Sequence, residues 1–491
     1  MSVTHELTDP GLMKSAAYVA GRWVSRGANG SRVLRNPSTG EALAELPQLD
    51  RAEVAAAIDA AHAAWRPWRL RAAKERARIL RAWFDLVTAN ADDLARLIVL
   101  EEGKPFAEAR GEVAYAASFI EWFAEEAKRV RGDVMAAPEA TRRIVVTREP
   151  VGVCAAITPW NFPAAMITRK AAPALAAGCT MVVKPAEQTP LTALALAELG
   201  EQAGIPAGVF NVVLGKAREI GPELTGNPLV RKVTFTGSTE IGRLLLAQSA
   251  ATVKKVSMEL GGNAPFLVFD DADVDAAVEG LVATKYRNTG QACISANRVY
   301  VQDGIHDRFV ERLVERVGRL KVGDGFEPGV HQGPLIDADA VAKVEEHVAD
   351  AVARGAVVAQ GGARHERGGN FFQPTVICNV ESGMRITREE TFGPVAPIVR
   401  FRDEAEAIAM ANATEYGLAA YLFASDARRV WRVSAAIDAG MVGINTGLIS
   451  NEVAPFGGVK QSGLGREGSI YGIDEYLELK YLAWEGAGES A

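Results

Sequence analysis

Cysteine is scarce in this chain of 491 residues, which contains only Cys154, Cys179, Cys293 and Cys378. They are scattered and form no CxxC pair, so we expect neither a disulfide framework nor a structural zinc site. The six histidines form no HExxH-type cluster. Metal catalysis therefore has little support in the sequence, and we predict no metal site.

The sequence also lacks long apolar runs and tracts of one charge. No segment approaches the roughly 20 continuous apolar residues that a membrane span needs. The N-terminal residues show neither a signal-peptide nor an Arg-rich transit pattern, so a cytoplasmic location is expected. The net charge is −7, from 54 basic and 61 acidic residues, with no Lys/Arg tract. Nucleic acid and membrane surfaces are therefore poor candidate partners.

Helical and strand patterns alternate along the chain, which indicates an α/β protein of two or three domains. Residues 51–131 show helical spacing of apolar residues. The segments TMVVKPAEQTP, GVFNVVLG and VRKVTFTGS each predict a strand that leads into a turn and helix, as in a nucleotide-binding sheet. Thr189 is predicted to cap the helix that begins at Pro190. A second α/β unit begins near Glu259, and the alternating C-terminal segment LELKYLAW could pair with another strand, including one of a second subunit.

Cys293 lies in NTGQACISAN, an uncharged stretch of small residues. A core position is the usual fate of a lone cysteine, and a nucleophile is the alternative. No histidine adjacent in sequence could activate the thiol. Activation would have to come from backbone dipoles, burial or a cationic cofactor.

Two segments fit a dinucleotide site. In VTFTGSTEIG a strand precedes Gly237, Ser238 and Gly242, whose backbone could approach a phosphate; a plain strand–turn–helix unit is the alternative. In VVKPAEQTP, Lys184 and Glu187 follow a strand and could hold ribose hydroxyls, or form a solvated loop pair.

Three further segments carry polar residues in stiff turns. In ITPWNFP two prolines flank Asn161, whose amide could donate to a developing oxyanion or merely cap a turn. MELGGNAP places Glu259 before a Gly-Gly turn, as a general base or as a surface carboxylate. EETFGPV offers Glu390 and Phe392, either as ligand contacts or as an ordinary turn.

Taken together and in this order, TPWNFP, KPAEQTP, FTGSTEIG, MELGGNAP, GQAC and EETFGPV resemble the motifs of the aldehyde dehydrogenase superfamily, over nearly the whole chain. The stretches PWNFPAAMITRKAAPALAAGCTMVVKPAEQTP, NEVAPFGGVKQSGLGREGS and YGIDEYLELKY are similar to those of succinate-semialdehyde dehydrogenases, whose close relatives act on glutarate semialdehyde. The resemblance implies NAD(P)-dependent oxidation of succinate semialdehyde, with glutarate semialdehyde or a broader aldehyde range as alternatives. A CoA-acylating enzyme and a catalytically silent NAD-binding protein are further alternatives. Glu259 favours water over CoA, and its presence with Cys293 and Asn161 argues against a silent protein.

Carried onto this sequence, the resemblance implies a role for each matching residue. Cys293 is the nucleophile, Asn161 and the Cys293 backbone N–H stabilise the oxyanion, and Glu259 activates water. The implied coenzyme contacts are Thr158, Trp160, Lys184, Glu187, Gly237, Ser238, Leu260, Glu390 and Phe392. The implied substrate contacts are Arg169, Arg287, Ser450, Phe162 and Phe456, with the arginines binding a carboxylate at the far end of the substrate.

Two positions refine this expectation. A carboxylate at Glu187 would repel a 2′-phosphate, so NAD is the expected coenzyme and NADP the alternative. Ser295 stands where some relatives carry a second cysteine, so a redox disulfide with Cys293 is not expected.

The implied fold is α/β, with a Rossmann-type NAD-binding domain, an α/β catalytic domain and a small β oligomerisation element. We expect the NAD-binding domain over residues 1–130 and 151–258 with part of 433–470, the catalytic domain over 259–432, and the oligomerisation element over 131–150 and 471–491. The family forms dimers or tetramers through that element. A homo-oligomer with a small-molecule aldehyde substrate is therefore expected.

Overall fold

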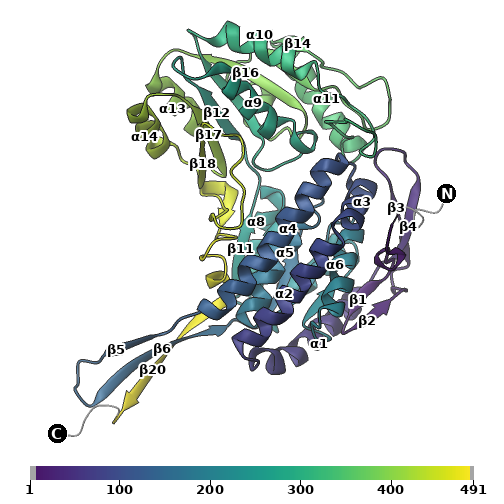
Figure 1. Cartoon of the computed structure of the whole chain (residues 1–491), viewed down its shortest axis with the longest axis vertical. Coiled ribbons are helices and arrows are strands. Elements are labelled where there is room, and N and C mark those ends of the chain that lie inside the picture. The colour runs from purple at the N-terminus through teal and green to yellow at the C-terminus, as the bar shows by residue number, and fades with distance from the viewer. Residues whose placement is uncertain (1–6, 487–491) are drawn as a thin grey trace.

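An eight-stranded sheet and its covering helices form the larger part of the molecule (Figure 1). The structure, a computed structural model, describes residues 7–486, so the ends of the predicted domain ranges at 1–6 and 487–491 lie outside it. The strand order is β19-β11-β10-β7-β8-β9-β1-β2, and β11, β10, β7, β8 and β9 run parallel. These strands are β1 (Ala17–Val19), β2 (Arg22–Val24), β7 (Val153–Ile157), β8 (Thr180–Lys184), β9 (Phe210–Val212), β10 (Val230–Thr236), β11 (Lys255–Glu259) and β19 (Gly463–Leu464).

Eight helices of the described residues accompany this sheet. Four of them come before β7, and one follows each of β7, β8, β9 and β10. They are α1 (Arg51–Arg69), α2 (Ala73–Ala89), α3 (Ala91–Glu102), α4 (Phe106–Glu126), α5 (Ala165–Ala177), α6 (Leu191–Gln202), α7 (Ala217–Gly226) and α8 (Thr239–Ala250). Strands β7 and β8 are buried along almost their whole length, and every residue of α5 is buried. Continuous apolar sequence is therefore required here, because parallel strands are covered on both faces.

The helix after β8 begins differently from the sequence prediction. Thr189 does not cap α6; its hydroxyl donates instead to the backbone oxygen of Trp160, at 3.2 Å. The first free amides of α6, at Leu191 and Thr192, donate to the buried carboxylate of Glu101 at 2.6 and 2.9 Å. A side chain about 90 positions earlier thus satisfies the helix end, and burial raises the pKa of Glu101 to about 8.

A seven-stranded sheet forms the second unit, in the order β14-β15-β16-β13-β12-β17-β18. Phe266 and Val268 of β12 pack into one apolar core, whereas Leu267 and Phe269 pack into another on the opposite face. The strands are β12 (Ala264–Val268), β13 (Ala296–Gln302), β14 (Val357–Gln360), β15 (Thr375–Cys378), β16 (Val395–Phe401), β17 (Ala419–Phe423) and β18 (Met441–Ile444). The helices are α9 (Val274–Lys285), α10 (His306–Val317), α11 (Ala338–Ala353), α12 (Arg385–Arg388), α13 (Glu404–Asn412) and α14 (Ala427–Ala436).

This sheet extends past the predicted boundary at residue 432. Strand β18 pairs in parallel with β17, so residues 441–444 belong to the second unit. The chain returns to the first sheet only at β19, which pairs with β11. Sequence alone did not separate these short strands because each has only two to four residues.

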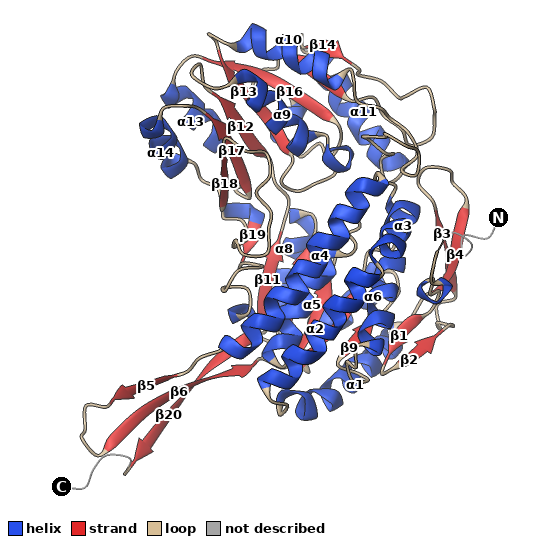
Figure 2. Ribbon diagram, viewed as in Figure 1, coloured by secondary structure: helices blue, strands red, loops and turns tan. Residues whose placement is uncertain are grey.

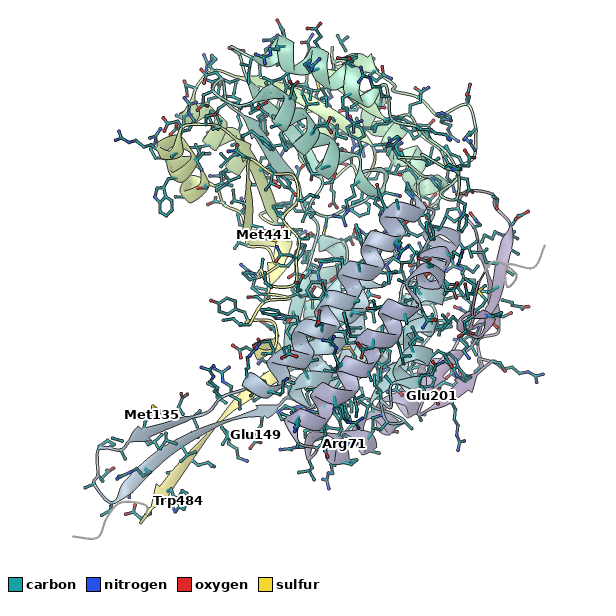
Figure 3. All side chains as sticks on the ribbon, in the orientation of Figure 1. Arg71, Met135, Glu149, Glu201, Met441 and Trp484 are labelled. Carbon is teal, nitrogen blue, oxygen red and sulfur yellow. The ribbon has the colours of Figure 1, made fainter. Side chains whose placement is uncertain are left out.

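A three-stranded arm of β5 (Asp133–Ala136), β6 (Arg142–Pro150) and β20 (Leu477–Glu485) projects from the body (Figure 2). The C-terminal segment therefore pairs within its own chain, with Leu477 opposite Pro150 and Glu485 opposite Arg142. Figure 3 shows Met135 and Trp484 on this arm, where their exposed fractions are 46% and 63%. A separate hairpin of β3 (Ser31–Arg35) and β4 (Ala42–Pro47) lies near the N-terminus.

Candidate active site

A cavity brings together residues from both units. Its wall is mainly apolar, and Arg169 and Arg287 are its only charged residues. All five residues predicted to contact the substrate line this cavity together with Cys293. The lining residues are Tyr115, Phe162, Met166, Arg169, Ala283, Thr284, Arg287, Ala292, Cys293, Ile294, Gly447, Ser450 and Phe456.

The backbone that leads to Cys293 is held in an uncommon conformation. Asn288, Thr289 and Gly290 have φ of 50°, 57° and 74°, so three successive residues are left-handed. A side chain at Gly290 would lie 2.2 Å from the backbone oxygen of Gly393, which excludes any other residue there. Such strain persists only when surrounding contacts impose it, and it is typical of functional sites.

Contacts from distant segments impose that conformation. The Asn288 amide donates to the Glu108 carboxylate of α4 at 2.7 Å. The Thr289 hydroxyl donates to the backbone oxygen of Gly333 at 3.1 Å, and the Gln291 side chain accepts from the amide of Ile336 at 2.9 Å. The segment before the cysteine is thus fixed from both units.

Cys293 itself is half-buried and faces the cavity. Gly262 lies against it so closely that a side chain there would meet the Cys293 backbone oxygen at 2.3 Å. Burial raises the pKa of the thiol to about 12; Arg169 lowers it, whereas Glu390 and Glu259 raise it further. The thiol is therefore protonated at neutral pH unless a further positive charge is present.

The Asn161 amide lies beside the cysteine segment. Its Nδ2 donates to the backbone oxygen of Gln291 at 2.9 Å, which fixes the amide plane and uses one of its two N–H groups. The backbone oxygen of Asn161 accepts from Lys104 Nζ at 2.7 Å and from Asn288 Nδ2 at 3.0 Å. The second Asn161 N–H has no acceptor among residues 7–486.

Lys104 is a positioning residue that the sequence analysis missed. It is buried, with Nζ 2.5 Å from the Glu112 carboxylate, and Glu112 accepts in turn from the amide of Ala164 at 2.9 Å. The pair therefore ties α4 to the Asn161 loop. The only sequence signal was a charged run, EEGKP, at the end of an otherwise apolar helix.

Glu259 ends β11 and is buried. Neither of its carboxylate oxygens has a hydrogen-bond partner in the described part of the chain. Burial raises its pKa well above the ordinary value, and nearby Glu467 raises it further, against Arg169 and Lys170. A buried carboxylate without hydrogen-bond partners is costly, and carboxylates with such perturbed pKa values cluster at functional sites.

Glu467 is the second residue that the sequence analysis missed. It accepts from Arg169 Nε at 2.8 Å and pairs with Lys170, whose Nζ also donates to Thr236 at 2.6 Å. Burial opposes ionisation of Glu467, but Lys170 and Arg169 lower its pKa to about 2. In the sequence it stands in a Gly-rich segment, GLGREGS, where a lone carboxylate looks solvated.

The two arginines of the cavity differ. Arg169 is buried, is paired with Glu467 and lies over the Phe456 ring at 4.0 Å. Arg287 is half-buried, with its guanidinium 5.1 Å from the centre of the Phe162 ring. No carboxylate within residues 7–486 forms an ion pair with Arg287. The charge of Arg287 is therefore available to a ligand, whereas Arg169 shares the Glu467 carboxylate with Lys170.

The predicted coenzyme residues gather at one edge of the first sheet. Thr158, Lys184, Gly237 and Leu260 end or follow β7, β8, β10 and β11, which are parallel neighbours. Ligands of open parallel sheets bind at this carboxyl edge. Ser238 caps α8 from there.

The second unit contributes the opposite side of this crevice. Glu390 accepts from the amide of Gly262 at 3.2 Å, and burial raises its pKa to about 7. Phe392 meets the Trp160 ring edge-on, with ring centres 5.5 Å apart. The buried Thr158 hydroxyl has no partner in the residues that the structure describes. An orphaned hydroxyl at this edge fits a polar ligand such as a dinucleotide.

Glu187 has a cationic partner, Arg32, that the sequence analysis did not include. Arg32 of the β3–β4 hairpin contacts its carboxylate at 2.7 Å, and the other oxygen accepts from the Ala217 amide at the start of α7 at 3.2 Å. Lys184 is buried beside it and donates to the backbone oxygen of Pro185 at 3.2 Å.

No helix within residues 7–486 is long and apolar enough to cross a membrane. In the same range, no group of three His, Cys, Asp or Glu side chains is arranged to hold a metal ion.

Comparison with known proteins gives concordant matches. The sequence model of the aldehyde dehydrogenase family matches residues 23–482. The chain is 61% identical to a glutarate-semialdehyde dehydrogenase of Pseudomonas aeruginosa, covering 98% of this chain and 100% of that protein. It is also 61% identical to the NADP(+) succinate-semialdehyde dehydrogenase of Escherichia coli, covering 97% and 99%. The crystal structure of an E. coli NADP-dependent enzyme superposes with a TM-score of 0.97 at 61% identity, covering 98% of this chain and 100% of that one.

Proposed function

Since the chain belongs to the aldehyde dehydrogenase family, we propose that it oxidises succinate semialdehyde to succinate with NAD(P) as the hydride acceptor. The observation that carries the substrate class is the charge of Arg287 on the wall of a mainly apolar cavity that contains Cys293 and Arg169. A half-buried guanidinium without an ion-pair partner in the described residues favours a ligand that brings its own carboxylate.

Glutarate semialdehyde, one methylene longer, is the second candidate. It is favoured by the P. aeruginosa relative, which is as similar to this chain as the E. coli succinate-semialdehyde dehydrogenase. Both substrates have an aldehyde at one end and a carboxylate at the other. The same two groups, Cys293 and Arg287, would hold them.

The reaction starts with the Cys293 sulfur, which attacks the aldehyde carbon and forms a hemithioacetal. The carbonyl oxygen then carries negative charge. The second N–H of Asn161 and the Cys293 backbone N–H would donate to it. Because Gln291 already fixes the Asn161 amide, little reorganisation is needed as charge develops.

The residues at the carboxyl edge of the first sheet fit a dinucleotide. Thr158, Lys184, Glu187 and Ser238 would hold its phosphates and adenosine sugar, with Gly237 and Leu260 lining the turn. Trp160, Glu390 and Phe392 would hold its nicotinamide half. When bound, NAD(P)+ supplies the hydride acceptor and a positive charge that favours the Cys293 thiolate.

Glu259 completes the cycle as a base. Loss of hydride leaves a thioester on Cys293, and water must attack its carbonyl carbon. Glu259 would take the proton of that water as the C–S bond breaks, releasing the acid and the thiolate. Its raised pKa makes it a stronger base than an ordinary carboxylate, and Glu467 maintains that shift through its own negative charge.

The experiment that tests the proposal is NADH or NADPH formation by the purified protein. Succinate semialdehyde is compared with glutarate semialdehyde and an uncharged aldehyde, with Cys293→Ala as the control. We expect the highest kcat/KM for succinate semialdehyde and none in the variant. A higher kcat/KM for glutarate semialdehyde would assign that aldehyde as the substrate. Equal rates with the uncharged aldehyde would contradict carboxylate binding by Arg287.

We also propose that the arm mediates self-association, as expected from the family. Val134, Met135, Leu479, Tyr481 and Trp484 expose large apolar side chains on it, and such a patch supports an interface between copies. Light scattering of the purified protein would give the oligomeric state. The cytoplasmic location and the exact domain limits stay predictions.

A further inference from the structure

The Glu187 carboxylate is the feature from which sequence reasoning predicts NAD over NADP, and the structure surrounds it with positive charge. The Arg32 guanidinium pairs with this carboxylate at 2.7 Å. Lys184 lies nearby: burial lowers its pKa, the Glu187 charge opposes that shift, and the Arg32 charge adds to it. Two cations therefore face one carboxylate at this end of the coenzyme site. The local charge does not exclude a phosphate.

Arg32 comes from an element that the predicted coenzyme site did not include. It lies on β3, roughly 155 residues before Glu187 in the chain, and its side chain reaches the loop that follows β8. A small pocket opens beside the pair, lined by the hairpin and by the loops after β8 and β9. Its wall includes Arg32, Pro185, Glu187 and Gly215. The Arg32 guanidinium therefore lies on the wall of a small pocket at this end of the coenzyme site.

The ion pair between Arg32 and Glu187 can also separate. The Arg32 and Glu187 side chains are 41% and 27% exposed, and ion pairs of this exposure contribute little net stability. Glu187 keeps a second partner, the Ala217 amide, when Arg32 turns away. An incoming phosphate would offer Arg32 a doubly charged partner in place of a singly charged one.

We propose that Arg32 is a specificity-determining residue that lets the coenzyme site accept dinucleotides with a 2′-phosphate as well as those with a 2′-hydroxyl. With a 2′-hydroxyl, Arg32 stays on Glu187 and the carboxylate accepts from the ribose. With a 2′-phosphate, Arg32 moves to the phosphate and offsets the repulsion by Glu187. This inference rests on the proposed NAD(P)-dependent function.

Half-coenzymes test the inference without any turnover. Calorimetric titration of the full-length protein with 5′-AMP and with adenosine 2′,5′-bisphosphate measures the 2′-phosphate contribution directly. In Arg32→Ala we expect the Kd of the 2′,5′-bisphosphate to rise roughly tenfold, with the Kd of 5′-AMP changed less than about twofold. The matched control is Arg35→Ala on the same strand, whose guanidinium contacts only the Gly40 backbone oxygen at 3.0 Å.

Two further variants sharpen the result. Arg32→Lys keeps the charge but not the planar fork, so its Kd for the 2′,5′-bisphosphate should lie between those of the wild type and Arg32→Ala. Glu187→Gln removes the repulsive charge and should tighten that Kd while weakening 5′-AMP binding. Arg32→Ala effects that are equal for both ligands, or absent for both, would overturn the proposal.

The proposed function and the proposed role of Arg32 can each fail without the other. If NADH forms with a semialdehyde but Arg32→Ala leaves the Kd ratio unchanged, only the role of Arg32 is wrong. If no aldehyde is oxidised yet the ratio changes as expected, the proposed function is wrong and the phosphate site stands. If the wild type binds neither half-coenzyme, both are wrong.

Discussion

Arg169 and Glu467 form a buried ion pair, with the arginine Nε 2.8 Å from the carboxylate, at the wall of the cavity that contains Cys293. The pair joins α5 of the first unit to the segment between β19 and β20. It also distinguishes the two arginines that were predicted to bind the substrate carboxylate. Arg169 has an ion-pair partner within the chain, whereas Arg287 has none among residues 7–486.

Arg169→Ala is therefore expected to act first on stability. It would leave Glu467 buried with only Lys170, and loss of one partner of a buried pair typically costs about 3–5 kcal/mol. Thermal unfolding followed by circular dichroism measures the loss. Arg287→Ala is the matched control and should unfold near the wild-type temperature. An Arg169→Ala protein as stable as the wild type would contradict the structural role of the pair.

Arg287→Ala is expected to act on the substrate. A hydrogen bond to a charged group contributes about 1.5–3 kcal/mol, so KM for succinate semialdehyde should rise roughly 10- to 100-fold. KM for an uncharged aldehyde of similar length should change less than about twofold. Steady-state kinetics with both aldehydes gives the comparison, and Arg287→Lys should show an intermediate loss. A similar rise for both aldehydes would show that Arg287 does not bind the carboxylate.

Asn161→Ala is expected to lower kcat roughly 10²- to 10³-fold, the usual effect of losing one oxyanion donor. The KM should change little because the donor acts mainly on the charged intermediate. The rate of Cys293 alkylation by iodoacetamide is a useful control, since it reports the thiol and not the oxyanion. Slower alkylation together with the lost activity would instead indicate a disturbed cysteine segment.

Loss of the Glu467 charge and loss of the Lys170 charge should shift the pH profile of thioester hydrolysis in opposite directions. Glu259 acts as a base only when ionised, and its pKa is raised, so hydrolysis should quicken as pH rises towards that value. Glu467→Gln removes a charge that raises the pKa of Glu259 and should shift the profile to lower pH. Lys170→Met removes a charge that lowers it and should shift the profile to higher pH.

Single-turnover hydrolysis of the acylated enzyme across pH 6–10 would measure both shifts. Because both substitutions break the same buried ion pair, a general loss of structure would move the two profiles alike. Shifts in the same direction would therefore rule out the electrostatic explanation.

Local sequence was a good guide wherever a strand leads directly to a site residue. Lys184 and Gly237 were singled out because each stands at the end of a strand of strong apolar pattern, and the parallel sheet brings them to one edge together with Thr158 and Leu260, which the family resemblance implied. The prediction for α6 was wrong because the residue that caps it, Glu101, lies on another helix. Glu467 and Arg32 were missed for the same reason, since only the folded chain shows which charges they face. The spacing of apolar residues within a short segment predicts helices and strands. Contacts between residues that lie far apart in the chain depend on tertiary packing.

The left-handed turn at Asn288–Gly290 makes the cysteine's reactivity a property of the finished protein. The turn is imposed by Glu108 from an early helix, by Gly333 and Ile336 from a later loop, and by Gly393 beyond them. A chain still emerging from the ribosome lacks the later contacts, and a partly unfolded one loses the earlier. In both cases the segment that leads to Cys293 has lost contacts that fix its backbone. The conformation at Cys293 is therefore completed only when both units have folded.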